Sequence, residues 1–146
     1  MRRIQRDVRH EDFVKSLTTG DHAIFRDIWR VLLFAAAYGV SRGVRTPLQK
    51  VDANKAMPES YFSSAGWRGF LYLLGFAGGT DSEHLRNDED QQNKLITAFE
   101  EYANYGLDEI QKRVSSPSKA LPEIVSILLE SSSVKKETAP NVSDLI

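Results

Sequence analysis

The amino-acid sequence predicts an all-α fold, a compact bundle of about five helices around a buried central helix at residues 22–38, with a long loop at 44–60. Apolar residues recur at three- and four-residue spacing over most of the chain, and breaks rich in Gly, Pro or Ser separate the periodic stretches. The length of 146 residues and the 41% hydrophobic content are typical of one folded domain. We expect this domain at residues 1–131, followed by a flexible C-terminal tail at 132–146 that is rich in Ser, Lys and Glu.

The first predicted helix spans residues 2–17 and ends at the Thr18-Thr19-Gly20 break. If it begins at Arg2, then Arg2, Arg6 and Arg9 lie at positions i, i+4 and i+7 and form one basic stripe, which is a candidate contact surface. The alternative interpretation is a solvated, partly frayed terminus.

The central helix is expected to begin after Asp21, which is suited to cap it. Between Ile28 and Tyr38 the one charged residue is Arg30, so this helix is apolar on nearly every side and must be enclosed by other helices. We expect Gly39 or Gly43 to end it in the left-handed conformation.

The second half of the chain contains three further helical patterns. A helix over 65–76 follows two serines that can cap it, although so short an apolar run also fits a strand. The longest periodic stretch predicts a helix from Asp88 or Asp90 to about Val114. A last helix carries its apolar residues on one face over 121–129.

Charge is divided unevenly along the chain. Residues 1–55 carry eleven Lys or Arg against six Asp or Glu, a net charge of +5, whereas the rest carries eight against fourteen, a net charge of −6. This asymmetry predicts a face for a polyanion or an acidic partner, and the excess of Arg over Lys favours bidentate contacts to phosphate or carboxylate. Arg26 and Arg30 are expected on the polar side of the central helix. The candidate nucleic-acid or partner-binding residues are Arg2, Arg3, Arg6, Arg9, Arg42, Arg45 and Lys50.

The sequence supports no catalytic residue, metal site or cofactor, and it leaves open whether the protein is an enzyme. The absence of Cys excludes disulfides, thiolate metal sites and Cys nucleophiles, and it fits a reducing cytoplasm. The three histidines, at 10, 22 and 84, are too far apart for a local metal motif. The longest apolar runs are about eight residues, far below the roughly twenty that span a bilayer, so we expect no membrane partner.

Residues 81–90 are acidic and include His84. Their carboxylates could hold a hard cation such as magnesium, which gives a metal-dependent hydrolase as the least favoured alternative function. The spacing lacks the pattern of a calcium loop, and acidic residues before a helix are favoured by the helix dipole. We therefore prefer the structural interpretation of this segment.

Three stretches of the first third of the chain resemble a family of small bacterial proteins. These stretches are RDVRHEDFVK at 6–15, IFRDIWRVLLFAAAYG at 24–39 and GVRTPL at 43–48. The family is that of the small proteins associated with DNA phosphorothioation and other DNA-modification systems. The resemblance implies a cytoplasmic protein acting beside the machinery that places sulfur in the DNA backbone, or beside the restriction arm of such a phage-defence system. It implies no reaction, so no catalytic role is carried over.

Two hypotheses of function follow. In the first, the protein is a non-enzymatic accessory protein that binds DNA phosphates weakly through its basic N-terminal third. In the second, it is an adaptor that docks an acidic protein of the same complex, with exposed apolar residues completing a homo-oligomer.

Overall fold

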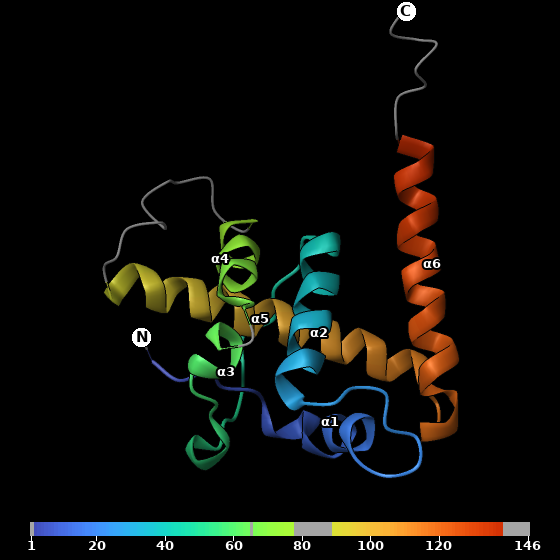
Figure 1. Cartoon of the computed structure of the whole chain (residues 1–146), viewed down its shortest axis with the longest axis horizontal. Helices are drawn as coiled ribbons and strands as arrows, with labels where there is room; N and C mark the ends of the chain where they lie inside the picture. The colour runs from blue at the N-terminus through green and yellow to red at the C-terminus, as the bar shows by residue number, and fades with distance from the viewer. Residues whose placement is uncertain (1, 65, 78–88, 139–146) are drawn as a thin grey trace, which may run out of the picture.

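The computed structural model describes residues 2–64, 66–77 and 89–138, and these form six α-helices and no β-sheet, which confirms the all-α prediction. The longest helix, α5, runs across the molecule, α2 crosses it, and α6 stands at one end (Figure 1). The helices are α1 (Glu11–Thr18), α2 (Ile28–Arg42), α3 (Ser60–Ser63), α4 (Arg68–Ala77), α5 (Glu89–Arg113) and α6 (Ala120–Thr138), with 3-10 turns η1 (Val8–His10), η2 (Ala53–Lys55) and η4 (Pro117–Lys119).

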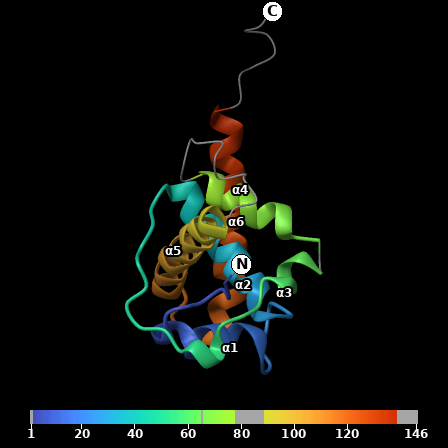
Figure 2. The same cartoon turned by 90° about the vertical axis from the view of Figure 1, so that its left-hand side faces the viewer.

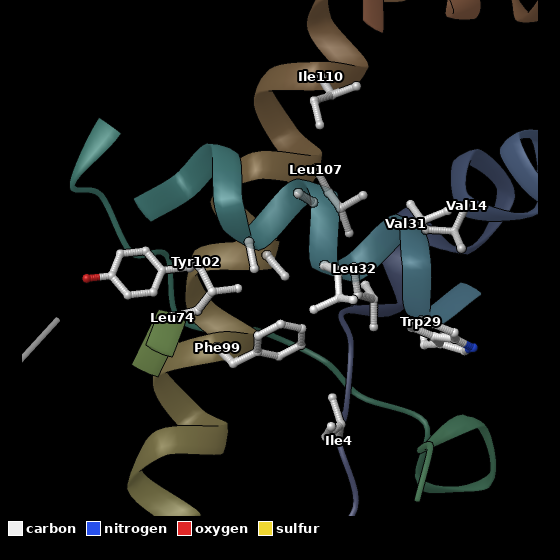
Figure 3. Close-up of a cluster of buried hydrophobic side chains, with 14 of the residues drawn as sticks. Ile4, Val14, Trp29, Val31, Leu32, Leu74, Phe99, Tyr102, Leu107 and Ile110 are labelled. Carbon is white, nitrogen blue, oxygen red and sulfur yellow. The ribbon is translucent and has the colours of Figure 1, made fainter. Parts of the chain in front are cut away.

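The core lies where α2 crosses α5. Leu32 of α2 and Phe99 and Leu107 of α5 are almost fully buried there (Figure 3). The two backbones approach closely because glycines lie at the crossing: a Cβ on Gly39 would overlap the carbonyl of Tyr102, and one on Gly106 would overlap the carbonyl of Ala35. The central helix predicted from the sequence is therefore confirmed as the element around which the others pack.

The predicted start of that helix was wrong. Helix α2 begins at Ile28 and not at residue 22, and it ends at Arg42 with Gly43 in the left-handed conformation at φ 67°. Residues 24 and 25 form a loop whose N–H groups both donate to the carbonyl of Leu17. Their side chains still pack against the core, which is why their spacing imitated a helix.

The predicted helix over residues 2–17 is also shorter than expected, because residues 2–7 are extended. Ile4 and Met57 exchange two backbone hydrogen bonds of 2.8 Å, and Asp7 pairs with Val51 in the same antiparallel sense. We call residues 2–7 paired with 51–57 the N-terminal clasp. Asp7 then accepts a hydrogen bond from the N–H of Arg9, which starts η1 and, through it, α1.

The long loop at 44–60 is irregular except for η2, and the clasp holds it against the bundle. Helix α4 packs against α5 and, less extensively, against α2. It begins at Arg68, three residues later than predicted.

Helix α6 runs to Thr138, so its last turns extend into the stretch expected to be a tail, and residues 139–146 lie outside the described part of the chain. Arg113 at the end of α5 pairs with Glu130 of α6 at 2.8 Å and with Glu123 of α6 at 3.4 Å. Helix α6 projects away from the bundle in two perpendicular views (Figures 1 and 2).

Candidate anion-binding cleft

The predicted basic stripe of Arg2, Arg6 and Arg9 does not form, because residues 2–7 are extended rather than helical. Arg2 donates two hydrogen bonds, of 2.7 and 2.9 Å, to the carboxylate of Glu100, whose side chain is 5% exposed. Hydrogen bonding to Glu100 raises the pKa of Arg2, although burial opposes the shift. Arg2 therefore anchors the N-terminal segment to α5 and supplies the counter-charge that the buried Glu100 requires.

Arg6 and Arg9 are likewise used inside the fold. The Nε atom of Arg6 lies 2.5 Å from Glu11, and the Arg6 side chain is 7% exposed. Arg9 donates to Asp108 at 2.7 Å and lies 3.4 Å from Asp7.

The remaining four candidate residues lie apart in different surroundings. Arg45 pairs with Glu101 at 3.0 Å. The Arg42 guanidinium lies over the ring of Tyr38, 5.3 Å from its centroid. Within the described part of the chain, Arg3 and Lys50 form no ion pair. The seven residues thus do not gather into one patch, and binding by any of them stays a prediction.

A different set of cations does converge, around an open cleft of about 770 Å³. Arg3 and Arg6 come from the clasp, Arg26 from the loop before α2, and Lys55 from η2. Asp27 also lines the cleft, and it pairs with Arg30 at 3.3 Å. Most of the lining charge is therefore positive.

Backbone pairing explains why these side chains meet. Successive residues of an extended segment point to opposite sides, so the burial of Ile4 in the core leaves Arg3 on the outer side. Arg3 donates to the carbonyl of Ala56 at 3.2 Å, and Arg6 donates to the carbonyl of Lys55 at 2.7 Å. These bonds tie one wall of the cleft to the other.

The cations of the cleft differ in whether they are paired with a carboxylate. Lys55 shares Glu11 with Arg6, at a distance of 3.3 Å. Arg26 is exposed and, among the described residues, it forms no ion pair, as is true of Arg3. Two guanidinium groups are thus available to an anionic ligand.

The rim of the cleft carries neutral groups that a ligand can contact. Tyr61 of α3 is 51% exposed, and Asn54 and Thr19 add polar side chains. Trp29 also lines the cleft, but it is 8% exposed and its ring packs edge-on against Phe62. Tyr61 is therefore the aromatic residue of the cleft that offers an open ring face.

Sequence reasoning placed Arg3 and Arg6 in the candidate set and left out Arg26, Lys55 and Tyr61. Arg26 was assigned to the polar side of a helix that in fact begins two residues later. The positive charge of residues 1–55 was the one signal that pointed to this region.

Metal chemistry finds no support in the described residues, where no group of three or more His, Asp or Glu could hold an ion. The acidic segment at 81–90 lies outside the described part of the chain except for Glu89 and Asp90 at the start of α5. No described helix is both long and apolar enough to cross a membrane.

A second surface feature is an apolar face on α6. Ile124 and Ile127 point into the core, whereas the neighbouring aliphatic side chains remain 44% to 63% exposed. The exposed residues of this α6 face are Leu121, Val125, Leu128 and Leu129.

Comparison with known proteins gives one match. No curated protein and no solved structure matches the chain. The family model described as DNA sulphur modification system-associated protein 4 matches residues 3–145, nearly the whole length. The chain therefore belongs to the family of DNA sulphur modification system-associated protein 4.

Proposed function

We propose that the protein is a non-catalytic accessory protein of a DNA sulphur modification system, acting in the cytoplasm and binding the DNA backbone weakly through the cleft. The convergence of Arg3, Arg26 and Lys55 on one open cleft is the observation that carries this proposal. It keeps the predicted function but assigns it to a different set of residues.

The charge pattern of the cleft suits an anionic ligand such as phosphate. Guanidinium groups without a carboxylate partner are well suited to bidentate contacts with phosphate oxygens. The cleft brings few such groups together, and the protein as a whole has a net charge of −1. We therefore expect weak affinity and no reading of base sequence.

Salt dependence tests this proposal. We expect fluorescence anisotropy with labelled DNA to show binding at about 50 mM salt that is largely lost at about 200 mM, because phosphate neutralisation releases counterions. The double variant Arg3→Ala/Arg26→Ala should bind about tenfold more weakly at low salt, and its salt slope should fall by about 2.

The matched control is Lys94→Ala/Lys112→Ala, which removes the same charge from exposed positions on α5 outside the cleft. Wild-type-like binding by this control is expected. Equal losses in both double variants, or no binding by the wild type at low salt, would contradict the proposal.

A second candidate function, a protein–protein adaptor, is supported by the α6 face. Four exposed aliphatic side chains on a helix that projects from the bundle resemble one half of a helix-mediated contact. An adaptor role is compatible with DNA contact at the cleft, because α6 lies at the other end of α5 from the clasp (Figure 1).

A further inference from the structure

We propose that the cleft holds an unpaired nucleotide of single-stranded DNA, with its base stacked on Tyr61 and its adjacent phosphates on Arg3 and Arg26. This inference rests on the proposed function and makes it specific, because backbone binding alone does not distinguish single strands from duplexes.

The shape of the site is the first argument. A volume of about 770 Å³ lies within the range of roughly 300 to 1,000 Å³ typical of sites that take small ligands. A flexible single strand can place one nucleotide in such a hollow. A duplex presents a convex backbone and keeps its base faces covered by neighbouring pairs, so its bases cannot reach the floor of the cleft.

The exposed ring of Tyr61 is the second argument. Trp67 is also exposed, but its ring packs edge-on against Phe70 at 5.8 Å. Trp29 is covered on one side by the guanidinium of Arg30, 4.5 Å from its centroid. Tyr61 has no such ring contact among the described residues, and half of its surface faces solvent at the rim.

The combination of these groups is the third argument. Proteins that bind single strands join a positively charged groove, which follows the phosphates, to aromatic rings on which bases stack. Arg3 and Arg26 provide the charges, because the acidic residue that lines the cleft, Asp27, is already paired with Arg30. Sequence preference is expected to be slight, since every base offers a face for stacking.

The test compares single-stranded oligothymidine of about 20 nucleotides with a duplex of the same length, by anisotropy at low salt. We expect the wild type to bind the single strand about tenfold more tightly than the duplex. Tyr61→Ala should weaken binding to the single strand by about tenfold and leave binding to the duplex unchanged, and Tyr61→Phe should retain the preference because it keeps the ring. Trp67→Ala, an exposed aromatic residue outside the cleft, is the matched control and should keep the preference.

A ligand-side measurement avoids dependence on any variant. A single strand of abasic residues keeps the phosphate charges and loses the bases, so the wild type should bind it as weakly as Tyr61→Ala binds oligothymidine. Equal affinity for single strand and duplex, or for abasic and normal strands, overturns this inference but leaves salt-dependent DNA binding intact. Tighter binding of single-stranded RNA than DNA also overturns it, and absence of all binding at low salt overturns the proposed function itself.

Discussion

The carboxylate of Asp7 binds the backbone of two segments where the N-terminal residues meet the helical bundle. This carboxylate is buried and accepts backbone hydrogen bonds from the N–H groups of Gln49 at 2.8 Å and Arg9 at 3.2 Å. Burial raises the pKa of Asp7, but these donors and the charge of Arg9 outweigh it, so the pKa lies below the ordinary value of 3.8. The ionised form therefore stabilises the folded state.

The sign of this shift predicts acid sensitivity. Stability contributed by Asp7 is present above its unfolded pKa and is lost as the pH falls through the lower folded pKa. Asp7→Asn should lower the free energy of unfolding by about 1 to 2 kcal/mol near neutral pH, measured by urea denaturation. The variant should also lose less stability than the wild type on acidification. The control is Asp12→Asn, which removes a carboxylate from an exposed position in α1 and should keep the acid sensitivity that Asp7 contributes. Parallel pH profiles for Asp7→Asn and wild type would contradict this assignment.

The ion-pair partners of individual arginines could not be predicted from the sequence. Arg2 and Glu100 are 98 positions apart, and Arg9 and Asp108 are 99 apart. Composition showed that the N-terminal part is basic, but whether a guanidinium faces solvent or a carboxylate depends on tertiary pairing. Local spacing carries no information on such pairs.

At the scale of helices, the crossing of α2 and α5 depends on two glycines, Gly39 and Gly106. Gly106→Ala should lower the free energy of unfolding by about 3 kcal/mol, because the added methyl group overlaps the carbonyl of Ala35 and forces the helices apart. Gly69→Ala is the matched control, since its Cβ would meet nothing within 4 Å and alanine is the better helix former. Thermal or urea unfolding of both variants measures the difference. Equal stability of Gly106→Ala and wild type would show that the helices do not approach so closely.

Element prediction succeeded where periodicity was long and failed where pairing was non-local. Helix α5 runs from Glu89 to Arg113, within one or two residues of the predicted bounds, because its apolar residues repeat over seven turns. The apolar residues of the N-terminal segment have a spacing compatible with a helix over a short span. The backbone of Ile4, however, forms its hydrogen bonds with the backbone of Met57. A pairing partner so distant in the chain leaves no local signature.

At the scale of the whole molecule, the α6 face predicts a protein partner. Leu121→Ser/Leu128→Ser should reduce recovery of partner proteins by about tenfold when the tagged protein is isolated with the products of its native operon, because the apolar contact is removed. The cleft variant Arg3→Ala/Arg26→Ala should retain these partners. Full recovery with the α6 variant would contradict an adaptor role for this face.

The sequence predicted the region of the candidate site and two of its four cations, Arg3 and Arg6, but not Arg26 or Lys55. Charge asymmetry directed attention to residues 1–55, which supply every cation of the cleft. The cleft itself arises because the clasp brings residue 3 beside residues 55–57, and the irregular turn before α2 adds Arg26. Neither feature produces a periodic pattern of apolar residues from which it could be predicted.

The clasp also determines when the cleft can form during synthesis. Its two halves are separated by the whole of α1 and α2, so Arg3 has no opposite wall until the chain beyond Met57 has emerged from the ribosome and closed this large loop. A nascent chain halted before that point carries the same arginines with nothing to hold them together. The DNA binding that we propose for the cleft would thus begin only after translation has passed α3.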